Sequence, residues 1–297
     1  MPNPVLVGYD PDTLDRGPVE LGAAVSRATG AAVVVCAVDP GSSAEARQAL
    51  DHAQSALRSA GRSVEVQLVR DTRAADGLAR AIEDVGPSLV VVGSTRRGAA
   101  GRVLLGSTAE RVVHDAPCPV AVTPHEYAPP AGGVRTIGAA FAPTPEGREA
   151  LRAAVLLGRA ADAHVRAIAV FEPKLAEHQS PDLMAGQHHD TAPEELAAGR
   201  HRIESEEGLR AAIAQAAPDG DVEADVLFQD PADGLVAASG GLDLLVMGSR
   251  GYGAKRGVVL GGVSRQVTAR AACPVLVLAR GTEGGVDRLL GQAAATS

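Results

Sequence analysis

The sequence predicts an α/β protein built from two doubly wound domains in tandem, each with a five-stranded parallel sheet. The segment from Gly93 to Val122 recurs at a constant offset of 155 residues as the segment from Gly248 to Val277. A repeat this long exceeds the roughly 20 to 50 residues of solenoid units, so it indicates two copies of a whole domain. In both copies β-rich runs alternate with helical patterns, which implies right-handed crossovers and helices on both faces of the sheet. Each copy is therefore predicted to be a Rossmann-like domain.

The composition agrees with two folded domains. A chain of 297 residues corresponds to about two domains of roughly 100 to 200 residues, and each copy is long enough to bury a core of its own. Aromatic residues are only 2% of the chain and Trp is absent, so Val, Leu, Ile and Ala must build the cores, as they do around parallel sheets. The net charge of −8 argues against nucleic acid as a partner.

The amino-terminal residues and the cysteines predict a cytoplasmic protein without membrane association. Residues 1–10 lack a basic segment followed by a long apolar one, and no stretch approaches the 18 or more apolar residues of a membrane span. Cys36, Cys118 and Cys273 show no metal-binding or redox spacing. We interpret them as small core residues.

The first copy is predicted to begin with a buried strand that leads into an Asp/Pro turn. Its strands are expected over residues 4–9, 31–38, 63–69, 88–92 and 119–123. Its helices are expected over residues 19–29, 43–60, 72–85 and 107–115. Gly30 is expected to end the first helix, and Asp71 or Thr72 to cap the third.

The second copy repeats this order. Its strands are expected over residues 136–141, 165–171, 222–228, 244–247 and 275–278. Its helices are expected over residues 145–161, 193–217, 232–239 and 262–272. The predicted division is a first domain over residues 1–126, a Pro/Gly linker over 127–133, a second domain over 134–281, and a tail over 282–297. We expect the tail to be frayed or lightly docked.

An insert at residues 172–191 interrupts the second copy and contains His178, His188 and His189. These histidines have no i, i+4 spacing, so we interpret the insert as a mobile polar loop rather than a metal site. No metal is expected.

The glycine-rich loops after the fourth strand of each copy are the candidate ligand sites. Ligands of open parallel sheets bind beyond the carboxyl ends of the strands. Residues 93–106 and 248–261 are rich in glycine and each precedes a helix. Glycine lets the backbone approach an anion, and the helix directs unpaired N–H groups to the same place. The loops therefore have the form of a phosphate cradle, although such loops are often only tight connections.

At these residues the chain resembles a known family. Gly248-x-x-Gly251, nine residues, Gly261, a helix and then Cys273-Pro274 resemble the ATP-binding pattern of the universal stress protein domain. The resemblance covers both copies. It implies an adenine nucleotide alpha hydrolase-like fold and ATP or a related adenine nucleotide as the ligand.

The resemblance also implies binding residues, and neither copy has the complete set. In the first copy the implied residues are Asp10, Val38, Gly93, Gly106, Ser107 and Thr108. There Arg96 replaces the second glycine of the pattern. In the second copy the implied residues are Gly248, Gly251, Gly261 and Gly262. Here Ala142 stands in the place of the acidic residue, and Gly262 replaces the hydroxyl residue.

Several of these residues also have an ordinary structural interpretation. Asp10 could simply be a turn residue at the end of a strand. Ser107 and Thr108 could be N-cap residues of the next helix. We find no GxSxG frame and no Walker A lysine-serine pair, and we predict no catalytic residue and no enzyme.

Two functions remain open at this point. The first is a regulatory module of the stress response that binds an adenine nucleotide. The second is a nucleotide-independent interaction or structural module with decayed sites. The last strands, with Cys118-Pro119-Val120 and Cys273-Pro274-Val275, resemble the segment through which single domains of the family pair. They imply that the two copies form an intramolecular pseudo-dimer, which could pair again into a homodimer.

Overall fold

The computed structural model describes most of the chain. The described residues are 2–41, 43–59, 64–94, 106–171, 206–215, 217, 221–249, 261–278 and 285–291. Three features of the sequence lie outside these ranges: Arg96, Gly251 and the histidine-containing insert.

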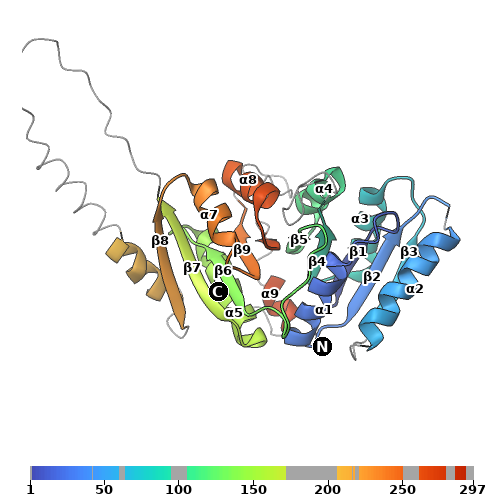
Figure 1. The fold of residues 1–297 in the computed structure, drawn as a ribbon, viewed down its shortest axis with the longest axis horizontal. Coiled ribbons are helices and arrows are strands. Elements are labelled where there is room, and N and C mark those ends of the chain that lie inside the picture. The colour runs from blue at the N-terminus through green and yellow to red at the C-terminus, as the bar shows by residue number, and fades with distance from the viewer. Residues whose placement is uncertain are drawn as a thin grey trace, which may run out of the picture.

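The fold is an α/β structure whose ten described strands form one sheet (Figure 1). The strand order is β3-β2-β1-β4-β5-β10-β9-β6-β7-β8, so each half has the same internal order. The strands of the first lobe are β1 (Val5–Tyr9), β2 (Val33–Val38), β3 (Val64–Val69), β4 (Leu89–Gly93) and β5 (Val120–Thr123). Those of the second lobe are β6 (Thr136–Ala140), β7 (His164–Phe171), β8 (Val222–Phe228), β9 (Leu244–Gly248) and β10 (Val275–Leu278).

The two predicted parallel sheets are present and are joined. All pairs within each lobe are parallel, as predicted, and β5 and β10 pair antiparallel and join the two sheets edge to edge. In this joint Val275 is the register partner of Val122, and Val277 is the partner of Val120. The joint confirms the predicted pairing of the last strands. It also removes one exposed edge from each lobe, because each last strand hydrogen-bonds to the other.

Helices cover both faces of this sheet. In the first lobe they are α1 (Gly17–Thr29), α2 (Ala44–Ser59), α3 (Ala74–Val85) and α4 (Ser107–Asp115). In the second lobe they are α5 (Pro145–Ala161), α7 (Pro231–Ser239) and α8 (Gly262–Arg270), with a further helical segment at residues 206–215. A short helix near the carboxyl end, α9, covers Gly285–Leu289.

The hydrophobic core is shared between the lobes. One cluster of buried side chains lies under α1, α2, α5 and α9, and a second lies under α3, α4, α7 and α8. Each cluster contains residues of both lobes. The reason is the β5–β10 joint, which continues both faces of the sheet from one lobe into the other.

The carboxyl end of α1 agrees with the prediction, and the amino end of α3 does not. Gly30 ends α1 with a left-handed backbone (φ 74°), as predicted. The predicted cap of α3 was wrong, because Arg73 occupies the N-cap position and provides no side-chain cap. Asp71 instead accepts a hydrogen bond from the backbone N–H of Arg73 before the helix begins.

Part of the carboxyl-terminal tail is docked more firmly than expected. In α9, Val286 and Leu289 are buried. Asp287 forms two hydrogen bonds of 2.8 Å with the guanidinium of Arg152 on α5. The backbone N–H of Asn3, just before β1, donates to the carbonyl of Arg288. The helix therefore connects the second lobe with the start of the first.

In the described ranges, no helix is long and apolar enough to cross a membrane.

Candidate functional site

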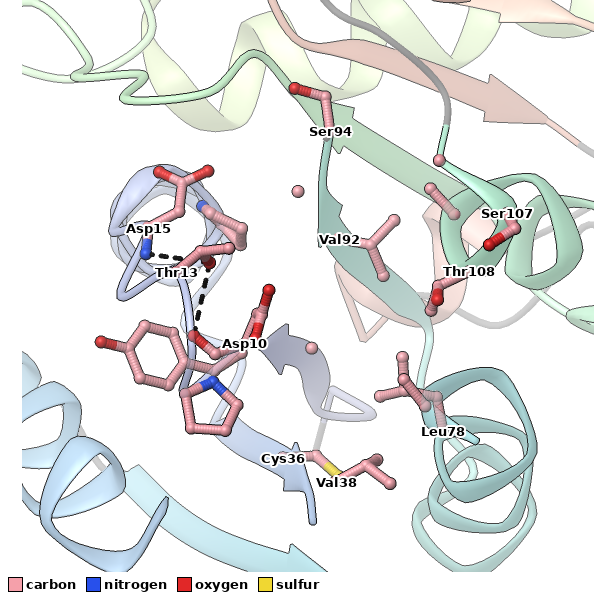
Figure 2. A pocket seen from close by; sticks show the side chains of 18 residues that line it. Asp10, Thr13, Asp15, Cys36, Val38, Leu78, Val92, Ser94, Ser107 and Thr108 are labelled. Atoms are coloured by element: carbon pink, nitrogen blue, oxygen red, sulfur yellow. Dashed lines mark hydrogen bonds between the residues drawn. The ribbon is translucent and has the colours of Figure 1, made fainter. Parts of the chain in front are cut away.

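A cavity of about 350 Å³ opens at the carboxyl ends of β1, β2 and β4 in the first lobe (Figure 2). The first strand lies between β2 and β4 in the sheet, and the chain runs through β2 and β3 on one side of it and through β4 and β5 on the other. Ligands bind at such switch points of doubly wound folds, and this volume is within the usual range for small-molecule sites. Six of the predicted residues line the cavity: Asp10, Val38, Gly93, Gly106, Ser107 and Thr108.

One end of the cavity is apolar. Cys36 and Val38 from β2 and Leu78 from α3 line it. Cys36 is fully buried, and burial raises the pKa of its thiol to about 12, so the thiol stays neutral. Helix α3 approaches β2 closely here, because a Cβ on Gly77 would lie 2.5 Å from a methyl group of Val38. This end can accept a flat apolar group such as a purine base.

Asp10 is a turn residue at the end of β1 and also lines the cavity. Its Oδ1 accepts a hydrogen bond of 3.0 Å from the backbone N–H of Asp12, which is an Asx turn. The residue is exposed at the end of β1, and its place among the lining residues leaves it accessible to a ligand.

The amino-terminal end of α4 forms another wall of the cavity. Gly106 is the N-cap residue, so the interpretation of Ser107 and Thr108 as N-caps was wrong. Because glycine has no side chain, the first N–H groups of α4 receive no side-chain cap from this position. These groups and the positive end of the helix dipole suit an anion such as a phosphate.

The second lobe has a cavity of about 500 Å³ at the corresponding place. Gly248, Gly261 and Gly262 line it, together with Ala142 in the place of the acidic residue. Helix α5 begins close to the loop that contains Ala142. A Cβ on Gly147, in the first turn of α5, would lie 2.2 Å from the carbonyl oxygen of Ala142. The structure thus brings three of the four predicted residues of this copy together, and the fourth, Gly251, is outside the described residues.

Sequence reasoning missed several polar residues of the first cavity, among them Asp15 and Ser94. Asp15 precedes the Gly17-Pro18 start of α1, which is a typical place for an acidic residue. No local pattern indicated that its side chain would be only 6% exposed and face the cavity. The described residues contain no group of three or more His, Cys, Asp or Glu side chains that could hold a metal ion.

The fold and the paired cavities define a tandem protein of the doubly wound class, with a cavity at the corresponding place in each lobe. The universal stress protein family model matches residues 1–124 and 133–279, so the chain belongs to this family.

Relatives with known sequences carry the same family name. A universal stress protein of Mycobacterium tuberculosis (strain H37Rv) is 33% identical over 197 residues, which cover 64% of this chain and 61% of that protein. The matched part thus spans less than two thirds of this relative. A single-domain universal stress protein of Mycolicibacterium smegmatis is 29% identical over 129 residues, covering 41% of this chain and 99% of its own.

Solved structures share the fold across both lobes. A protein of unknown function from Pseudomonas aeruginosa PAO1 aligns with a TM-score of 0.67 and 19% identity, covering 98% of this chain and 96% of its own. A universal stress protein from Archaeoglobus fulgidus aligns with a TM-score of 0.60 and 19% identity, and the alignment covers 95% of this chain and 100% of that protein's chain. At this identity the likeness establishes the fold alone.

Proposed function

We propose that this protein is a regulatory module of the stress response that binds ATP or a related adenine nucleotide, chiefly in the cavity of the first lobe. The observation that carries the proposal is the convergence of the predicted residues. Asp10, Val38, Gly93 and Gly106 come from four separate segments of the chain and line one cavity of suitable size. We further propose a cytoplasmic location and a role that depends on occupancy rather than catalysis.

The cavity offers matching surroundings for the parts of a nucleotide. The apolar end around Cys36 and Val38 suits the base, and the amino-terminal end of α4 suits the phosphates. Gly93 also lines the cavity and presents no side chain to the ligand. Base and phosphate can therefore be held at the same time, with the sugar joining them.

The second cavity supports a weaker and less selective site. Gly261 caps α8 without a side-chain hydrogen bond, as Gly106 does for α4, so the anion-binding N–H groups are retained. Ala142 provides no polar group for the base and sugar, and Glu146 adds a carboxylate to the cavity wall. A carboxylate disfavours a polyphosphate there, because like charges repel at close range.

Two variants test the first site. Asp10→Ala removes the carboxylate, and Gly106→Ala adds a methyl group where the backbone (φ −80°) suits any residue, so the fold is retained. We expect each to weaken ATP binding by about tenfold, since loss of a polar contact or an added clash costs about 1.4 kcal/mol or more. Isothermal titration calorimetry measures the change. Gly261→Ala, at the matching place in the second lobe, is the control and should leave the tighter site unaffected.

A second measurement separates this function from a nucleotide-independent interaction module. The purified protein is denatured, and released small molecules are identified by mass spectrometry. Release of an adenine nucleotide, or an increase in the midpoint temperature of unfolding at millimolar ATP, supports the proposal. Absence of both contradicts it and favours the interaction module.

A further inference from the structure

Three buried polar atoms that form no hydrogen bond lie in or beside the wall at one end of the first cavity. In the described part of the chain, Oδ2 of Asp15, Oγ of Ser94 and Nδ1 of His125 are buried and form no hydrogen bond. Figure 2 shows Asp15 and Ser94 at the end of the cavity away from Cys36 and Val38, with the Ser94 hydroxyl directed to the side on which Asp15 lies. We call Asp15 and Ser94, with His125 beside the carboxylate, the polar corner.

The carboxylate of Asp15 is held in one orientation. Its Oδ1 accepts hydrogen bonds of 3.0 Å from the backbone N–H groups of Gly17 and Glu126. Its Oδ2 lies 3.3 Å from Nδ1 of His125, but the geometry is not that of a hydrogen bond. The side chain is only 6% exposed. Leaving a buried charged acceptor without a donor is costly, so this oxygen points to a donor that arrives with a ligand.

The neighbouring backbone leaves room beside this oxygen. A Cβ on Gly93 would lie 3.3 Å from Oδ2 of Asp15. Glycine at this position therefore leaves free the space that a side chain would fill. Both Gly93 and Asp15 line the cavity, so a ligand seated against Gly93 meets the carboxylate.

The second lobe provides an internal comparison. Ser249 occupies the position that matches Ser94, but its hydroxyl donates to the carbonyl of Leu278 at 3.1 Å and is fully buried. The loop between β6 and α5 consists of residues 141–144, whereas residues 10–16 join β1 to α1, and only the longer loop carries an acid at this place. The polar corner is thus not a requirement of the fold. It belongs to the first lobe.

The chemistry of the corner selects the part of a nucleotide that it can meet. A carboxylate repels a phosphate, so the phosphates belong at the opposite wall near Ser107 and Thr108. The apolar end near Val38 suits the base. The remaining donors of a nucleotide are the hydroxyl groups of the sugar, which joins the base to the phosphates.

We infer that Asp15 and Ser94 read the sugar hydroxyl groups of the nucleotide, so that the first lobe selects ribonucleotides over deoxyribonucleotides. The inference rests on the proposed function and adds a specificity to it. Asp15 accepts a hydrogen bond from a sugar hydroxyl at Oδ2, and Ser94 completes the contact. Without that hydroxyl, Oδ2 of the buried carboxylate receives no hydrogen bond, and this is the source of the discrimination.

The test compares the affinities of ATP, 2′-deoxy-ATP and 3′-deoxy-ATP by titration calorimetry. The native protein should bind at least one deoxy analogue about tenfold or more weakly than ATP, as expected for loss of a hydrogen bond to a charged group. Asp15→Asn keeps an oxygen for Gly17 and Glu126 but replaces the acceptor facing the ligand with a donor. It should reduce the discrimination to about twofold or less, and Ser94→Ala should reduce it partly.

Two controls identify effects unrelated to the corner. Asp12→Asn changes an exposed acid in the same loop, and Ser249→Ala changes the matching serine of the second lobe. Both should keep the native discrimination. Thermal unfolding monitored by circular dichroism verifies that Asp15→Asn is folded.

The possible failures are distinguishable. Equal affinities of the native protein for ATP and both deoxy analogues would overturn this inference while leaving the proposed function intact. An unchanged ratio in Asp15→Asn, with or without a general loss of affinity, would assign the carboxylate a structural or cation-binding role and overturn it as well. If none of the three nucleotides binds, both the inference and the proposed function fail.

Discussion

At the level of single residues, the paired charges on the surface differ greatly in what they contribute. Arg152 donates two hydrogen bonds to Asp287, whose side chain is 9% exposed. Arg265 and Glu110 also link the two lobes, between α8 and α4, but their side chains are 67% and 49% exposed. Exposed pairs of this kind contribute little, because water and salt screen them. The Arg152–Asp287 pair is therefore the one to test.

We predict that Asp287→Asn lowers the free energy of unfolding by about 1–3 kcal/mol at pH 7, because it weakens two charge-assisted hydrogen bonds. Hydrogen bonding to Arg152 lowers the pKa of Asp287 below its usual value. Its contribution is thus present above the unfolded pKa of about 3.9 and is lost as the pH falls through the lowered, folded value.

Urea denaturation of the native protein and of Asp287→Asn, at pH 7 and in steps below pH 4, measures this effect. The difference between the two proteins should shrink as the pH falls. Arg265→Ala is the control and should change the free energy by less than about 0.5 kcal/mol. A difference that stays constant with pH would show that the charge of Asp287 does not contribute.

At the level of elements, close packing decides where glycine is required. Helix α5 begins at Pro145, capped by the side chain of Thr144, which accepts from the N–H of Gly147. A Cβ on Gly147 would lie 2.2 Å from the backbone oxygen of Ala142. Backbone cannot rotate away as a side chain can, so the start of α5 would have to shift.

We predict that Gly147→Ala lowers the free energy of unfolding by more than about 2 kcal/mol, as expected for overpacking. Gly208 lies in the helical segment 206–215 with no heavy atom within 4 Å of a Cβ built there. Gly208→Ala should therefore stabilise the protein slightly, by up to about 1 kcal/mol, through helix propensity. Chemical denaturation measures both. Equal effects of the two substitutions would contradict this account of packing at Ala142.

At the level of the whole molecule, the two lobes share one sheet and two cores. The β5–β10 joint, the tail helix and the linker all connect them. In the linker, the hydroxyl of Tyr127 reaches the carbonyl of Asp243, whose carboxylate accepts from the backbone N–H groups of Arg135 and Thr136. Unfolding one lobe would expose the last strand and the core surface of the other.

We therefore predict a single cooperative thermal transition for both lobes. In differential scanning calorimetry the calorimetric and van't Hoff enthalpies should agree, as they do for two-state unfolding. Circular dichroism should give the same midpoint. Two resolved transitions would mean that the shared sheet does not couple the lobes.

Local patterns and the family resemblance together predicted much of the candidate site. The glycine-rich loops could be placed because strand ends and helix starts depend on nearby sequence, and the resemblance implied Asp10 and Val38. Asp15 could not be found in this way. Its partner Glu126 is 111 residues away along the chain, and only the packing of the linker against α1 brings the two together.

The sequence by itself determined that this protein contains a duplicated, doubly wound fold with a glycine-rich loop after the fourth strand of each copy. The periodicity of apolar residues and the internal repeat are properties of the linear sequence, so recognising them requires no knowledge of distant contacts. Only the tertiary structure decided that the last strands pair antiparallel into one continuous sheet, that the cores run across both lobes, and that the first cavity has a polar corner which the second lacks. These features depend on which surfaces meet in space. Edge pairing and side-chain burial result from packing between segments that are far apart in the sequence, and local patterns do not determine that packing.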